Sequence, residues 1–185
     1  SDGYNEYFGN SRPYKKMEWS LATTYAANTI PGDQDLYFSK ALGASIKGNK
    51  FSDSALTRIS MMAQVPRDMD TSFRVQFQIS FICDTAVSGD VEFVVRYDIT
   101  KDGSAIYTSA ANAPENTTAE KSFPVIKSVT TDQVLYNALV EIHVCNVNPN
   151  LFQSIWLTVE RDAQIGNTND TYAGNVSILQ FYSEY

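Results

Sequence analysis

Apolar and polar residues alternate with a period of two in the middle of the chain, and no other feature of the sequence restricts the fold as strongly. Five apolar residues occupy alternate positions of the first stretch: Phe73, Val75, Phe77, Ile79 and Phe81. Because successive side chains of a strand point to opposite faces of a sheet, this stretch is predicted to be a half-buried strand. The alternation returns in residues 91–99 after the turn residues Ser88-Gly89-Asp90. The two stretches are predicted to pair as an antiparallel hairpin.

Further strands are indicated on both sides of this pair. Shorter alternating stretches predict strands at residues 36–42, 56–63, 105–109, 125–129 and 155–159. Residues 131–147 fit a helical stripe as well as a strand, and the strand is favoured. Residues 175–185 carry apolar side chains on both parities, which predicts a strand buried on both faces, central to a sheet or to an interface. Polar loops are predicted at residues 110–121 and 161–174.

Short strands without intervening helices are typical of an all-β fold, and the aromatic fraction of 12% agrees with pleated strands. The sequence predicts a jelly-roll-like antiparallel β-sandwich of about eight strands over residues 36–185. Residues 1–35 lack sustained periodicity and are predicted to form an extended N-terminal arm. Its rings are candidates for attachment or oligomer contacts: Tyr4, Tyr7, Phe8, Tyr14 and Trp19.

The charge and the hydropathy of the chain argue against two classes of partner. A net charge of −7 disfavours nucleic acid, because binding to a phosphate backbone draws its affinity from Lys and Arg. No stretch approaches the roughly 20 consecutive apolar residues needed to cross a bilayer, so membrane insertion is not expected.

The sequence contains few candidates for catalytic or cofactor-binding residues. His143 is the only histidine, and no Ser, Cys or second His stands at a spacing that would complete a catalytic triad. The sequence also lacks the phosphate-binding glycine motifs and the zinc spacings. Three strand carboxylates, Glu92, Glu141 and Glu160, are interpreted as outward-facing charges, with a hydrolase site as the minor alternative. No catalytic residue and no cofactor are predicted.

The two cysteines, Cys83 and Cys145, lie in apolar strand-like runs. They are predicted to be buried free thiols, since buried Cys usually behaves as a small apolar residue. A disulfide between neighbouring strands is the alternative.

The loop at residues 161–174 holds the only candidate metal ligands, all of them oxygen donors of the kind that calcium prefers: Asp162, Asn167, Asn169 and Asp170. Such residues also form turns by bonding their own backbone, and that interpretation is preferred. Arg161, beside Asp162 and Asp170, is predicted to stabilise the loop through a bidentate ion pair. Gly174 is predicted to let the backbone turn into the last strand.

Two ordered motifs resemble structural proteins of tailed bacteriophages, of the tail-fibre, appendage and head-decoration types. The first is Val65-Pro66-Arg67-Asp68-Met69-Asp70, followed by the alternating strand and Ser88-Gly89-Asp90-Val91. The second joins Leu157-Thr158-Val159-Glu160-Arg161-Asp162 to Asp170-Thr171-Tyr172-Ala173-Gly174-Asn175-Val176. The resemblance implies a jelly-roll domain, usually trimeric, that belongs to a virion and has no catalytic residues.

The leading hypothesis is a non-enzymatic virion subunit that forms a homotrimer and docks onto capsid or tail proteins through residues 1–35. Host-surface glycan is a further candidate partner. The alternative is a carbohydrate-binding β-sandwich module of a secreted or cell-surface protein, in which Trp19, Trp156 or exposed tyrosines stack on sugars.

Overall fold

A computed structural model gives the fold of the chain. It describes residues 15–17, 20–22, 32–36, 46–69, 75–101, 122–142, 153–164 and 166–185. These residues form ten strands and no helix, so no helix among them could cross a membrane. The strands are β1 (Ser20–Ala22), β2 (Gly32–Leu36), β3 (Ile46–Phe51), β4 (Leu56–Gln64), β5 (Val75–Cys83), β6 (Gly89–Lys101), β7 (Ser122–Val129), β8 (Leu135–Ile142), β9 (Gln153–Asp162) and β10 (Val176–Glu184).

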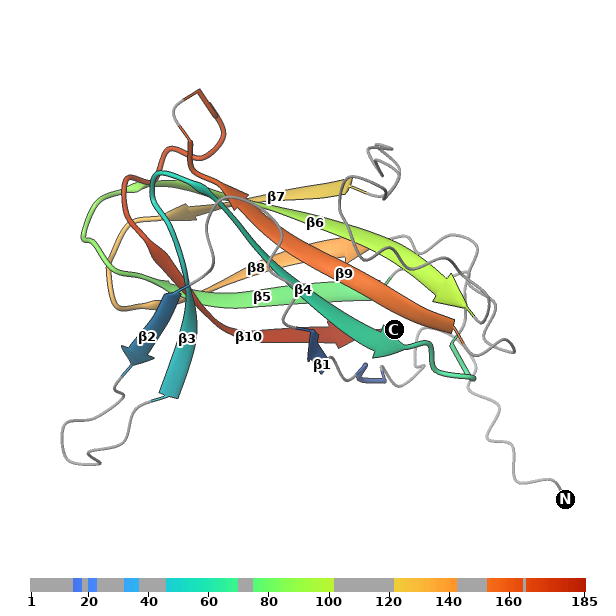
Figure 1. Cartoon of the computed structure of the whole chain (residues 1–185). Helices are drawn as coiled ribbons and strands as arrows, with labels where there is room; N and C mark the ends of the chain where they lie inside the picture. Colours follow the sequence, from blue (N-terminus) through green and yellow to red (C-terminus); the bar gives the residue numbers. More distant parts are fainter. Residues whose placement is uncertain are drawn as a thin grey trace, which may run out of the picture.

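The strands form two antiparallel five-stranded sheets that face each other (Figure 1). The β9 sheet has the order β1-β4-β9-β6-β7, and the β10 sheet has the order β2-β3-β10-β5-β8. From β3 to β10, consecutive strands alternate between the two sheets, with one exception: β6 and β7 are both in the β9 sheet. β3, the first of these eight strands, lies beside β10, the last. This order is the jelly roll, and it confirms the predicted fold class. Figure 1 also shows β2 and β3 extending away from the body of the sandwich.

The predicted hairpin of the two alternating stretches is wrong. β5 lies in the β10 sheet, whereas β6 lies in the β9 sheet and pairs with β7 and β9. Their apolar faces meet across the core, where the rings of Phe81 and Phe93 stand edge to face with centroids 5.1 Å apart. Alternation places each strand with one face on the core, but it does not distinguish pairing within a sheet from contact between sheets.

The last strand occupies the predicted central position. β10 lies between β3 and β5, and its register with β5 shifts between Ile178 and Gln180. Before this bulge Val176 and Ile178 face the core, and after it Ser183 is buried instead, so the inward parity changes. A bulge inserts one extra residue into a strand, which explains why apolar residues appear on both parities. The ambiguous region at residues 131–147 contains a strand, β8, as favoured.

Parts of the predicted arm belong to the sheets. Residues 20–22 pair with β4, and Lys16 bridges to Glu184 at the end of β10. The predicted boundary between residues 35 and 36 falls inside β2, which pairs with β3 along its whole length. The five aromatic residues proposed for attachment lie outside the described residues.

Candidate functional site

Arg161 lies at the centre of a buried cluster at the end of the sandwich where β10 begins. Its side chain is fully buried, and that of Asp170 is 1% exposed. Nε and Nη2 donate to the two carboxylate oxygens of Asp170 at 2.8 and 2.9 Å. The remaining N–H groups reach the carbonyl oxygens of Ser52 at 3.1 Å, Gly174 at 2.8 Å and Tyr172 at 2.9 Å. All five guanidinium donors are therefore satisfied, which is what permits a charge to be buried here.

We call these five residues the Arg161 cluster: Ser52, Arg161, Asp170, Tyr172 and Gly174. The bidentate pair predicted with Asp170 is present, whereas Asp162 takes no part in it. Asp162 accepts a hydrogen bond from the backbone of Gln164 at 3.2 Å. That contact is a local turn, because Asp side chains readily bond a backbone N–H two residues ahead.

The segment after Asp170 fastens this loop to the connection between β5 and β6. The backbone N–H groups of Thr171 and Tyr172 both donate to the carbonyl oxygen of Asp90, at 2.9 and 3.0 Å. The Tyr172 hydroxyl accepts from the Thr85 N–H at 3.0 Å and donates to the Thr85 carbonyl at 2.9 Å. The second resemblance motif therefore forms a joint between the two sheets.

Gly89 and Gly174 are required by close packing around Tyr172. A Cβ at Gly174 would lie 2.7 Å from the Tyr172 hydroxyl, and one at Gly89 would lie 2.8 Å from the Tyr172 Cα. Real Cβ atoms do not approach this closely, so at Gly89, where the contact is with backbone, only glycine fits, and at Gly174 a Cβ would push the Tyr172 and Thr85 side chains aside. The φ of Gly174 is not positive, so this contact, and not a turn reserved for glycine, is the reason for glycine there.

The four candidate calcium ligands already have partners within the protein. Asn167 and Asn169 donate their amide groups to the two oxygens of Glu92, both at 3.0 Å, and Asn167 also donates to the Asp162 carbonyl at 2.7 Å. Asp170 is neutralised by Arg161. No group of three or more acidic, His or Cys side chains suited to a metal occurs among the described residues. These contacts support the turn interpretation.

Two of the three strand carboxylates are buried, although they lie on outward faces. Glu92 is 7% exposed and is covered by the two asparagines; Glu160 is 5% exposed and pairs with Arg58 and with Arg96, the latter at 3.3 Å. Glu141 is exposed. Each buried carboxylate is thus held by its own donors, two amide groups for Glu92 and two guanidinium groups for Glu160.

A second cluster, the Asp68 cluster, joins both ends of the described chain at the opposite end of β10. The Lys15 ammonium pairs with the Asp68 carboxylate, and the Tyr185 hydroxyl donates to Asp68 at 3.1 Å. The hydrogen bond from Lys15 holds the pKa of Asp68 below its ordinary value. Lys15 and Tyr185 also exchange backbone hydrogen bonds at 3.2 and 3.0 Å. Through Asp68, the first resemblance motif therefore connects the segment at Lys15 to the end of the chain at Tyr185.

Large apolar side chains are exposed along the edge strands β7 and β8. Ile126 of β7 is 51% exposed, and Leu135 and Leu139 of β8 are each 55% exposed. Val134, in the turn between the two strands, is 45% exposed. β7 and β8 lie against each other and each pairs with one neighbour only. Ile126 points outward from the β9 sheet, whereas Leu135 and Leu139 point outward from the β10 sheet.

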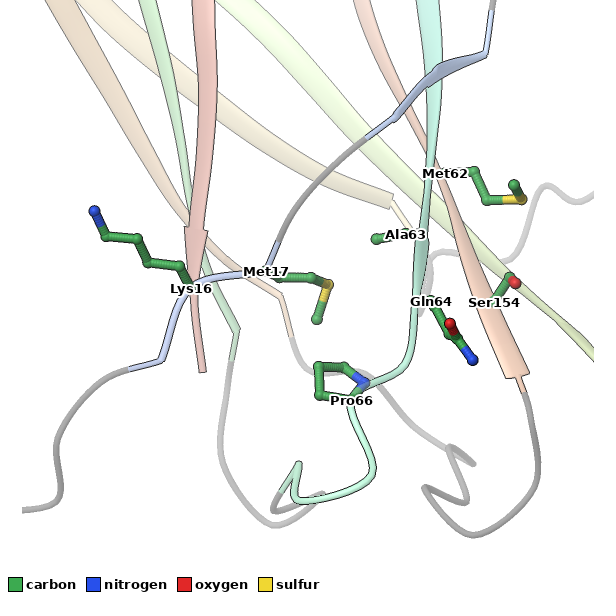
Figure 2. Close-up of a pocket in the computed structure, with 7 residues that line it drawn as sticks. All are labelled: Lys16, Met17, Met62, Ala63, Gln64, Pro66 and Ser154. Carbon is green, nitrogen blue, oxygen red and sulfur yellow. The ribbon is translucent and has the colours of Figure 1, made fainter.

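A pocket of about 440 Å³ lies beside the end of β4 (Figure 2). Its lining is mixed: Lys16, Met17, Met62, Ala63, Gln64, Pro66 and Ser154. Figure 2 shows Met17 pointing toward Pro66, whereas Lys16 points away. The Lys16 ammonium lies 5.1 Å from the centroid of the Tyr182 ring. The pocket is therefore lined mainly by apolar and neutral polar groups.

The remaining candidate for chemistry in the described residues is Cys83. Its thiol is buried and free, and burial raises its pKa to about 11, so it is protonated at neutral pH. His143 and Cys145 lie outside the described residues.

Sequence reasoning missed the Asp68 cluster and the amide contacts of Glu92. Lys15 and Asp68 are 53 residues apart, and Asn167 and Glu92 are 75 residues apart, so no local pattern connects them. No protein-family model matches the chain, and no curated protein matches it.

Proposed function

We propose that the chain is a non-enzymatic structural subunit of a tailed-bacteriophage virion, a jelly-roll module that assembles as a homotrimer. The observation that carries the proposal is the pair of exposed leucines, Leu135 and Leu139, on the outward face of the edge strand β8. Large apolar residues exposed together on one edge strand are typical of protein–protein contacts. A second copy of the chain is the partner that a self-assembling subunit would place there.

The resemblance motifs support the virion part of the proposal through their structural use. The Arg161 cluster and the Asp68 cluster fasten the loops and chain segments at the two ends of β10. A rigid scaffold with its side chains committed to internal contacts suits a particle component that joins capsid or tail proteins.

Light scattering of the purified protein tests the assembly. At micromolar concentration we expect three times the chain mass for the wild type, and a monomer for Leu135→Lys/Leu139→Lys, since two charges cannot be buried at the contact. Ser54→Lys/Gln64→Lys adds the same charge at exposed residues away from β8 and should remain a trimer. A wild-type monomer would overturn the proposal. Electron microscopy of particles labelled with antibodies against the protein tests its place in the virion.

A further inference from the structure

Trp156 lies on the outer face of the β9 sheet. It alternates along β9 with Ile155 and Leu157, which are both 1% exposed and belong to the core. Trp156 itself is half-buried. A tryptophan on the outward parity contributes no area to the core, so one face of a large ring remains at the surface of the sheet.

Hydrogen bonds fix this ring in place. The indole Nε1 donates to Thr100 Oγ1 at 2.9 Å, and the Thr100 hydroxyl donates in turn to the Ser154 carbonyl at 3.5 Å. The only polar atom of the indole is therefore satisfied within the protein, and the ring is held in one orientation. A ring fixed before binding loses little side-chain entropy when a ligand packs against it.

Neutral polar groups and a carboxylate surround the ring. In the register of the sheet, Met62 stands on one side of Trp156 and Asp98 on the other. The next row contains Gln64, Ser154 and Thr100. Gln64 and Asp98 are exposed, and Ser154 is half-buried.

Residues that flank the ring also line the pocket of Figure 2. Met62, Gln64 and Ser154 are register neighbours of this part of β9, and the same three residues line the pocket. Figure 2 shows Gln64 and Ser154 side by side at its edge. A flat apolar ring, hydrogen-bonding side chains and a hollow of about 440 Å³ are thus contiguous. We call this surface the Trp156 face.

We propose that the Trp156 face binds neutral carbohydrate. The C–H face of a pyranose packs on an indole ring, while its hydroxyl groups require the donors and acceptors that Gln64, Asp98 and Ser154 supply. A second sugar unit would enter the adjoining pocket. A nucleobase would stack equally well, but the net charge of −7 opposes the phosphates that accompany it. The site is separate from the β7–β8 edge and does not depend on trimer formation.

Affinity electrophoresis in native gels that contain dextran, mannan, hydroxyethyl cellulose or glycol chitin tests the proposal. We expect retardation of the wild type by at least one of these polysaccharides, and a loss of at least tenfold in affinity for Trp156→Ala. Trp156→Tyr keeps a stacking ring and should retain part of the binding. Leu139→Ala, on the other sheet, is the matched control and should bind as the wild type does.

Two measurements separate binding from folding and assembly. Gln64→Ala and Asp98→Ala change exposed side chains, and we expect each to weaken retardation at least threefold with an unchanged melting temperature. The Leu135→Lys/Leu139→Lys protein should bind as well per chain as the wild type, so failure of assembly and failure of glycan binding are read independently. The proposal is overturned if no polysaccharide retards the wild type, or if Trp156→Ala is retarded equally.

Discussion

Among single residues, Arg161 has the most demanding environment. Its guanidinium satisfies one carboxylate and three carbonyl oxygens, and these belong to the segments around Ser52 and around residues 170–174. Lysine could not replace it, because an ammonium has three donors and lacks the planar fork that meets a carboxylate through two parallel bonds. The residue therefore specifies the geometry of the loop and also neutralises Asp170.

We expect Arg161→Ala to lower the free energy of unfolding by about 3–5 kcal/mol, because removal of one partner leaves the other charge buried and unpaired. The loop at residues 163–174 should also become sensitive to protease. Urea unfolding and limited proteolysis measure the two effects. Arg96→Ala is the control: its side chain is 38% exposed, so the loss should stay within about 1 kcal/mol. Equal losses in both variants would contradict this account of the Arg161 cluster.

Single residues also show which side-chain contacts could be predicted from the sequence. The Arg161–Asp170 pair was predictable, because Arg161 lies at the end of β9, Asp170 follows nine positions later, and the two charges are opposite. The burial of Glu92 was not, since the amide groups that cover it come from another part of the chain. Strand parity predicts the direction of a side chain, but burial on an outward face depends on which loop folds over it.

Among the strands, β7 and β8 differ in how their edges are protected. β7 carries Pro124 and Lys127, and both residue types discourage pairing with another strand. β8 contains neither Pro nor Lys, and it exposes two leucines. Of these two neighbouring edges, β8 is therefore the one open to addition of a strand or packing of a second subunit.

The short segment at residues 15–17 should be held less firmly on the sandwich in acid. Its attachment includes the carboxylate of Asp68, whose pKa is lowered from 3.8 mainly by the hydrogen bond from Lys15. A lowered pKa contributes stability above the ordinary value, and this contribution is lost as the pH falls below about 4. The protection factors of the Lys15 and Met17 amides, which donate to Tyr185 and Ser183, should fall between pH 5 and pH 3, once the slower intrinsic exchange in acid is divided out.

Asp68→Asn is the control for this experiment. It removes the titrating group, so exchange at the same two amides should follow the intrinsic pH dependence alone. Amides of the β5–β10 ladder provide an internal reference in both proteins. An acid-induced change of the same size in Asp68→Asn would show that Asp68 is not responsible.

The positions of the strands were more predictable than their neighbours. Alternation located β5, β6 and β9, because each puts one face on the core. It did not reveal that β5 and β6 lie in different sheets, because both arrangements bury the same parity. In β10 the bulge was hidden for a related reason: one extra residue changes the inward parity and imitates burial on both faces.

For the whole molecule, the buried Cys83 thiol should make the free energy of unfolding decrease at alkaline pH. Burial raises its pKa from 9.0 to about 11. A raised pKa means that the thiolate is favoured in the unfolded chain, so stability is complete below pH 9 and falls as the pH rises toward 11. Urea unfolding from pH 8 to pH 11 should show a steeper loss for the wild type than for Cys83→Ala. Groups that titrate in both proteins and do not contact the thiol cancel in the difference, whereas Tyr172, which hydrogen-bonds to Cys83, belongs to the same coupled effect. Identical slopes would refute the expectation.

The central position of β10 also has a consequence for the order in which the protein folds. β3 and β5 are synthesised well before β10, yet they are joined to each other only through it. Until β10 enters, the β10 sheet consists of separate pieces with open edges, and most of its contacts link residues distant in sequence. Folding during synthesis therefore cannot complete the sandwich early, and the unfinished chain exposes strand edges that invite association with other copies.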